Sequence, residues 1–311
     1  MKDQQMKKLV VGSLSVSAIL CFALVAHAQF ASTVLSYDSG SGFIPGYTTA
    51  DSALGAPSAF TPGPYGGPVD PFDPPYLPEQ VVSVGAGGSI TLRMSAPILN
   101  NPANPFGLDF NIFGNSGFVI INGDYSGGGI TDGSFLGNNT GATRVEVSQD
   151  GATWYVLDPA FAPTVDGLYP TDGSGNPQVA VNPALTSSDF AGLGLSGIQS
   201  LYAGSAGGTG FDLSWARDSY GYAVELPSAS YVRIDVLSGT SEIDAIAAVP
   251  EPSGGALALI GLGLIWWARS SSEKEWGRLV PTKINETHGD GPSPLRFGRA
   301  QRASTKDKFL S

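Results

Sequence analysis

The stretch TRVEVSQDGATWYVL, residues 143–157, carries the clearest strand pattern in this chain of 311 residues. Its first half alternates apolar with polar side chains, in the order Arg144, Val145, Glu146, Val147 and Ser148. A period of two places the valines on one face of a strand and the polar residues on the other. Asp150-Gly151 then supplies a pair that favours the positive φ angles of a hairpin turn. The stretch therefore predicts a β-hairpin with one buried face.

Further strand patterns lie on both sides of this hairpin. The candidate strands are 31–37, 80–84, 88–94, 108–113, 118–121, 231–236 and 242–246. The alternation over 108–113 predicts a half-buried strand, and the unbroken apolar run 118–121 predicts a strand in the core. Residues 187–201 favour one or two helical turns, because their glycines oppose a long helix.

Proline and glycine set the remaining architecture. The chain contains 42 glycines and 23 prolines, and seven prolines crowd residues 62–78. Each proline removes a donor from a strand ladder, so this stretch predicts a surface loop. Residues 29–248 are therefore expected to form an all-β domain. We expect a single large antiparallel β-sandwich, jelly-roll-like, with long loops.

The first 28 residues are typical of an export signal. Lysines precede the apolar run 9–25, and a small-x-small triplet with Ala26 and Ala28 as its small residues follows. Cleavage by signal peptidase after Ala28 is the prediction, and an uncleaved transmembrane helix is the alternative. Cys21, the only cysteine, lies inside this segment, so the mature chain is expected to have no disulfide.

Charge in residues 29–248 is strongly negative, with 4 arginines against 20 acidic residues and a net charge of −16. Nucleic acid binding is disfavoured, because phosphate contacts need a basic surface. An acidic domain suits an exported protein that meets divalent cations or neutral polysaccharide, although acidity also serves solubility alone.

The available chemistry is limited because residues 29–248 contain no histidine and no cysteine. This excludes Ser-His-Asp and Cys-His nucleophilic sites and the usual zinc sites from that region. Paired carboxylates for glycoside hydrolysis remain possible, but twenty acids give no specific pair. The sequence therefore predicts a domain that is not an enzyme and needs no cofactor, calcium excepted.

Calcium has one candidate loop. Asp172, Ser174 and Asn176 place an oxygen-bearing side chain at every second residue, which suits a hard cation. The spacing departs from an EF-hand, so an ordinary Asp-Gly turn is the favoured interpretation and a calcium site is the alternative. Asp70, Asp73 and Asp212 have no better support as ligands.

Aromatic residues in loops are expected to pack in the core or to anchor their loops, and stacking on sugar rings is the alternative role. These aromatics are Tyr65, Phe72, Tyr76, Tyr202, Tyr220 and Tyr222.

Residues 249–269 read VPEPSGGALALIGLGLIWWAR. Val249 precedes the triplet Pro250, Glu251 and Pro252, and the apolar run 254–268 ends at Arg269. This order resembles the PEP-CTERM sorting signal of exported bacterial proteins. The resemblance implies that 254–268 occupies the inner membrane until an exosortase-type enzyme processes the protein at the triplet. Residues 270–311 carry eight further basic residues and are expected to form a disordered cytoplasmic tail, or a read-through of an ancestral stop.

The hairpin at 143–157 is similar to that of discoidin-like, galactose-binding-like sandwiches. Residues 207–213, 231–234 and 242–245 resemble the closing half of surface domains that precede this sorting signal. Together the resemblances imply a non-catalytic protein of the cell surface or extracellular matrix of a Gram-negative-type bacterium, associated with exopolysaccharide or adhesion. A carboxylate-based glycan-active enzyme and a permanently anchored periplasmic protein are the alternatives.

Overall fold

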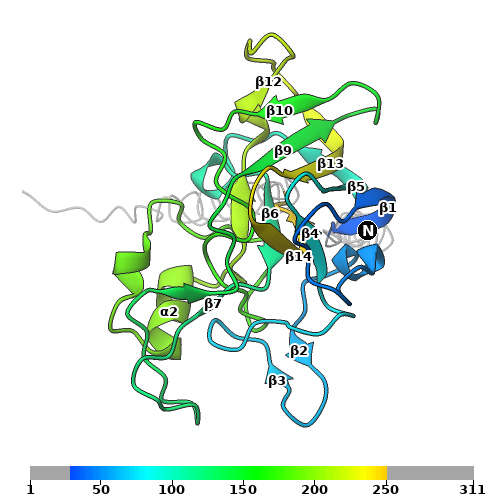
Figure 1. Cartoon of the computed structure of the whole chain (residues 1–311). Helices are drawn as coiled ribbons and strands as arrows, with labels where there is room; N and C mark the ends of the chain where they lie inside the picture. The colour runs from blue at the N-terminus through cyan, green and yellow to red at the C-terminus, as the bar shows by residue number, and fades with distance from the viewer. Residues whose placement is uncertain (1–28, 251–311) are drawn as a thin grey trace, which may run out of the picture. The chain divides into compact units, whose positions relative to one another are not determined.

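The structure is a computed structural model that describes residues 29–250, which Figure 1 draws in colour. The predicted signal peptide, the residues from Glu251 to Arg269 and the basic tail lie outside this range. Within it, no helix is long and apolar enough to cross a membrane.

The described residues form mostly β-strands in antiparallel sheets, which confirms the all-β prediction. The strands are β1 (Ala31–Asp38), β2 (Phe60–Thr61), β3 (Gly67–Pro68), β4 (Val82–Gly85), β5 (Ser89–Leu99), β6 (Phe110–Gly114), β7 (Gly117–Phe118), β8 (Phe135–Leu136), β9 (Thr143–Ser148), β10 (Tyr155–Leu157), β11 (Thr209–Phe211), β12 (Ala216–Arg217), β13 (Ser228–Val236) and β14 (Thr240–Ala248). The helical elements are α2 (Leu195–Tyr202) and the 3-10 turns η1 (Ala50–Ala53), η2 (Pro105–Gly107), η3 (Ser187–Phe190) and η4 (Leu213–Trp215).

Two larger sheets organise the domain. One has the strand order β1-β5-β13-β9-β10-β12, and the other has the order β11-β6-β14-β4. Two short hairpins, β2-β3 and β7-β8, stand apart from both sheets. Strands β4 and β5 are consecutive in the chain but belong to different sheets, so the glycines between them connect one sheet to the other. A Cβ on Gly40 would lie 2.4 Å from the Gly88 nitrogen, so glycine permits this close approach of two backbones.

The predicted hairpin is present as β9 and β10, with Val147 opposite Tyr155. Val145 and Val147 are buried, as their alternation predicts. Gly151 has a φ of 76°, and the Asp150 carboxylate accepts hydrogen bonds from the amides of Ala152 and Thr153 at 2.8 Å each. The turn is therefore held by its own side chain.

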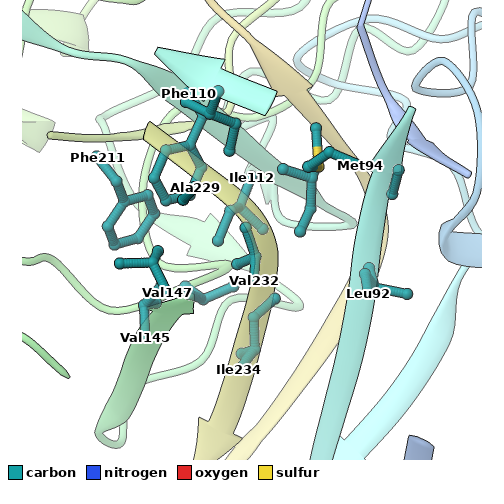
Figure 2. Close-up of a cluster of buried hydrophobic side chains, with 14 of the residues drawn as sticks. Leu92, Met94, Phe110, Ile112, Val145, Val147, Phe211, Ala229, Val232 and Ile234 are labelled. Atoms are coloured by element: carbon teal, nitrogen blue, oxygen red, sulfur yellow. The ribbon is translucent and has the colours of Figure 1, made fainter. Parts of the chain in front are cut away.

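The two larger sheets enclose one hydrophobic core. Figure 2 shows Leu92, Val147 and Val232 from the six-stranded sheet together with Phe110 and Ile112 of the four-stranded sheet. These side chains are 0–1 % exposed, and burial of one such side chain stabilises the fold by about 1.5–3 kcal/mol.

The prediction of a half-buried strand over 108–113 is wrong, because β6 is buried along its whole length. Loop residues cover its second face. Asn111 donates a hydrogen bond to the Pro177 carbonyl at 3.0 Å, and Phe113 packs with Ala206. The loop residues around Pro177 and Ala206 thus cover the face of β6 that the alternating pattern alone predicts to be exposed to solvent.

A second, smaller core lies under the loops. It contains Phe118, Tyr169, Val181, Phe190, Ile198 and Tyr202. The prediction of a core strand over 118–121 therefore holds only for Phe118, since Ile121 is 55 % exposed. Figure 1 shows β2, β3, β7 and α2 at one end of the domain and β10 and β12 at the opposite end.

Candidate functional site

A pocket of about 370 Å³ opens among the loops that surround the second core. Residues 68–73, residues 120–129 and Leu195 at the start of α2 contribute its lining. The charged and aromatic residues of the lining are Asp70, Phe72, Asp73, Asp124 and Tyr125. The lining thus combines three carboxylates and two aromatic rings with apolar residues such as Ile120 and Leu195.

The first lining segment is a tight turn. One Asp70 carboxylate oxygen accepts hydrogen bonds from the Phe72 amide at 2.8 Å and the Asp73 amide at 3.1 Å. This turn sets Phe72 against Phe118, with ring centroids 6.5 Å apart in an edge contact. Partial burial, and then the charge of Asp70, raises the pKa of the Asp73 carboxyl. The turn therefore places an aromatic ring and two carboxylates beside one another.

The second lining segment carries Asp124 and Tyr125. Ser126 donates to one Asp124 oxygen through its hydroxyl at 2.6 Å and its amide at 2.9 Å, and these bonds lower the pKa of that carboxyl. Asp124 is thus held as an anion. Tyr125 is 80 % exposed, so its ring is free to contact a ligand.

Asn122 braces this second segment from within. Its side-chain amide donates to the Gly128 carbonyl at 2.8 Å, and its side-chain oxygen accepts from the Ile130 amide at 3.2 Å. A Cβ on Gly128 would lie 2.1 Å from an Asp124 oxygen, so only glycine lets the loop close over that carboxylate.

Two buried carboxylates fix the loops that lead to the pocket. Asp244 accepts from the Ser58 amide at 2.7 Å and from its hydroxyl at 2.9 Å. Asp166 accepts from the Ser116 amide at 3.0 Å and the Glu242 amide at 3.1 Å. Asp244 and Glu242 lie on β14, so the chain leading into each pocket segment is tied to that strand at Ser58 and Ser116.

Burial changes the acidity of these anchors. Desolvation raises the pKa of the Asp166 carboxyl to about 8, with a contribution from the nearby charge of Glu242. Desolvation also raises the pKa of Asp244 to about 7 and that of Asp109 to about 6. These groups hold their protons more tightly in the folded protein than in an unfolded chain.

The arginines are placed away from the pocket lining. Arg144 and Arg233 both pair with Asp235, at 2.8 and 2.9 Å, and Arg217 pairs with Asp158 at 3.1 Å. The pocket lining contains carboxylates and no basic side chain. Its electrostatic character is therefore negative.

The calcium candidates occupy separate turns. The Asp172 carboxylate accepts from the Ser174 amide at 3.0 Å and hydroxyl at 2.7 Å, whereas the Asn176 oxygen accepts from the Gln178 amide at 3.0 Å. Within residues 29–250, no group of three or more His, Cys, Asp or Glu side chains is arranged to hold a metal ion. Calcium binding by Asp172, Ser174 and Asn176 stays a prediction.

The structure separates the other candidates. Asp70, Asp73 and Phe72 come together in the pocket, whereas Asp212 accepts from the Ser214 amide at 2.7 Å at the start of η4. Tyr202 is only 1 % exposed and its hydroxyl donates to the Pro170 carbonyl, which confirms core packing for this residue and excludes the alternative of sugar stacking. The remaining aromatics differ in exposure: Tyr65, Tyr220 and Tyr222 are exposed, and Tyr76 is half-buried.

Sequence reasoning missed Asp124 and Tyr125. Their signal was the glycine-rich stretch 123–129, which marks close backbone packing but does not name a binding site.

Of the predicted processing residues, the structure describes Val249 and Pro250. The Val249 side chain is 5 % exposed and packs with Leu108 and Ala180. Its amide donates to the Asp109 carbonyl at 2.8 Å. Ala26, Ala28, Glu251, Pro252 and Arg269 lie outside the described residues.

No protein-family model matches this chain, and no curated protein is similar enough to count as a relative.

Proposed function

We propose that residues 29–248 form a non-catalytic exported module that associates with exopolysaccharide through the acidic, aromatic pocket. The module is a jelly-roll-like β-sandwich of the galactose-binding-like type, sorted by a PEP-CTERM signal to the cell surface or matrix. The observation that carries the proposal is the pocket itself, where Tyr125 and Phe72 adjoin three carboxylates.

This combination of groups suits a sugar. Hydroxyl groups of a saccharide donate hydrogen bonds, and ionised carboxylates act only as acceptors. An exposed aromatic ring offers an apolar face for the C–H side of a pyranose, while the carboxylates fix its orientation. The anchoring to β14 of the chain that leads into both pocket segments supports binding, because a positioned site loses less entropy on binding.

Binding to glycan arrays and to isolated bacterial exopolysaccharide tests the proposal. We expect Tyr125→Ala and Asp73→Asn each to weaken binding about tenfold, a loss of about 1.4 kcal/mol. Tyr220→Ala is the matched control, because Tyr220 is an equally exposed aromatic outside the pocket. Absence of wild-type binding with and without calcium would remove the polysaccharide role and leave a structural one.

A carboxylate-based glycan-active enzyme is the second candidate. The proximity of Asp73 to Asp70 in one turn favours it, since a pair of carboxyl groups is what glycoside hydrolysis uses, and partial burial raises the pKa of Asp73. Release of reducing ends from bacterial polysaccharides, abolished by Asp73→Asn, would establish this activity. Inactivity across a broad panel would count against it.

A permanently anchored periplasmic protein remains the third candidate. Mass spectrometry of the C-terminus of the mature protein distinguishes it from the sorted form. We expect a C-terminus close to Pro250-Glu251-Pro252 after sorting. An intact tail through Ser311 would instead indicate a permanent anchor.

A further inference from the structure

The domain holds both ends of its chain at one place. The Ala248 amide donates to the Gln29 carbonyl at 2.9 Å, and Phe30 pairs with Ala247 in an antiparallel bridge. One residue later, the Val249 amide donates to the Asp109 carbonyl at 2.8 Å. The chain is therefore fixed to the folded domain up to Val249.

The predicted membrane segment starts very close to this fixed point. Five peptide steps separate Val249 from Gly254, and a fully extended chain covers about 3.5 Å per residue, or about 17 Å in all. The polar layer on each side of a bilayer is about 5–8 Å thick. Once 254–268 is in the membrane, little more than that polar layer fits between the hydrocarbon core and the domain surface around Val249.

Two exposed aromatic side chains are linked to this point. Phe106, three residues before Asp109, is 56 % exposed, and Phe161 is 59 % exposed. Trp215 connects Phe161 to Val249, because it packs against the cluster that contains Leu108 and Val249 and its ring centroid lies 6.2 Å from that of Phe161. We call Phe106, Phe161 and Trp215 the exit surface.

Phe106 also has an unusual backbone conformation. Its φ of 60° and ψ of 10° are left-handed, a conformation that costs energy for a side chain other than glycine. Strained residues of this kind concentrate at functional positions. Here the strain presents a large apolar ring to solvent.

From these observations we propose that the exit surface lies in the membrane–water interface while the chain is anchored, with Phe106 and Phe161 inserted among the lipid headgroups. This inference rests on the proposed sorting function, which places 254–268 in the membrane. Tryptophan is enriched at that interface, and exposed phenylalanine side chains insert at the headgroup boundary. Arg217, two residues after Trp215, is paired with Asp158, so the proposed contact does not rely on it to bind an anionic lipid.

This orientation also directs the pocket outward. Trp215 directly precedes β12 and Phe161 follows shortly after β10, whereas the pocket is built beside β3 and α2. Figure 1 shows these two groups of elements at opposite ends of the domain. An anchored domain would hold its pocket toward the polysaccharide.

Depth-dependent quenching of a fluorophore tests the inference on the full chain in phosphatidylcholine vesicles. A Cys21→Ala background removes the only cysteine, and Phe106→Cys, Phe161→Cys and Tyr65→Cys then give single labelling sites. Tyr65 is the matched control because it is 89 % exposed and lies between β2 and β3 at the opposite end. Thermal unfolding of each labelled protein verifies its fold.

We expect a quencher attached to lipid headgroups to reduce emission severalfold more at positions 106 and 161 than at 65. If the chain resists carbonate extraction but positions 106 and 161 respond only to an aqueous quencher, the inference is overturned. The membrane segment of the proposed function is then still supported. If carbonate extracts the chain, the membrane segment of the proposed function fails and the inference fails with it.

Discussion

The main-chain amide of Ala248 donates a hydrogen bond of 2.9 Å to the main-chain carbonyl of Gln29, so the first and last residues of the domain lie side by side. Gln29, which follows the predicted signal-peptidase site, therefore lies next to Ala248, which is two residues before the predicted sorting triplet. In an export precursor with both apolar segments in one membrane, the two segments would continue from neighbouring points of the domain.

Removal of the Asp244 carboxylate is predicted to destabilise the protein. Asp244→Ala removes two hydrogen bonds to Ser58 and leaves a partly buried amide without its partner. Loss of such contacts costs about 1–3 kcal/mol for each group left unpaired. We expect the free energy of unfolding to fall by about 2–4 kcal/mol in urea denaturation.

The matched control for Asp244 is Asp132. Its carboxylate accepts the same two kinds of hydrogen bond, from the Ser134 amide at 2.9 Å and hydroxyl at 2.5 Å, but at an exposed position. Asp132→Ala is expected to change stability by no more than about 0.5 kcal/mol. Equal losses for the two variants would show that burial of Asp244 contributes nothing.

Stability is predicted to fall as the pH rises from about 4 to about 8. Burial raises the folded pKa of Asp109 to about 6, of Asp244 to about 7 and of Asp166 to about 8, whereas an unfolded aspartate titrates near 4. The folded state therefore binds more protons in this window. The stabilisation is complete below the unfolded pKa and is lost as the pH passes each folded pKa.

Each extra proton held by the folded state contributes a slope of about 1.4 kcal/mol per pH unit. Urea denaturation at pH 5 and pH 8 measures the effect. Asp166→Asn combined with Asp244→Asn should flatten the dependence, because amides mimic the protonated acids without titrating. A wild-type protein that gains stability between pH 5 and pH 8 would contradict this assignment.

Local patterns predicted much of the β-structure. Alternation around Val145 and Val147 with Asp150-Gly151 specified the hairpin, because period and turn chemistry are local properties. Burial of β6 on both faces was not predicted, since the cover comes from residues near Pro177 and Ala206, more than sixty residues away. The assignment of β4 and β5 to different sheets also depends on long-range pairing.

The candidate site was only partly predictable for the same reason. Asp70, Phe72 and Asp73 attracted attention as acidic and aromatic loop residues. Asp124 and Tyr125 join them only because β7 and the second core bring residues 120–129 next to residues 68–73. The roles of Asp166 and Asp244 as anchors were equally hidden, since their partners Ser116 and Ser58 are distant in sequence.

Ligand charge is predicted to control binding at the pocket. Asp70, Asp73 and Asp124 line it without a basic side chain, so a uronic acid would bring like charges together. We expect neutral or amine-bearing saccharides to bind and polyuronates to bind weakly, as measured by calorimetry. Asp73→Asn should reduce the difference in affinity between the two classes of saccharide. Equal affinity of the wild type for both classes would contradict a negatively charged pocket.

Processing at Pro250-Glu251-Pro252 is predicted to be limited by the attachment of Val249. The hydrogen bond to Asp109 and the packing on Leu108 and Ala180 hold the residue directly before the triplet. An enzyme in the membrane must therefore release this end or approach the domain surface itself. A flexible insertion of about ten Gly and Ser residues between Val249 and Pro250 adds reach without changing the triplet.

We expect this insertion to speed conversion of the precursor in cells that contain the processing enzyme, as followed by pulse labelling and mass spectrometry. The same insertion placed after Arg269 is the control, because it lengthens the chain on the other side of the apolar run. Val249→Ser should act in the same direction as the first insertion, since it weakens packing in the cluster. Unchanged rates for both variants would mean that the attached end is already accessible.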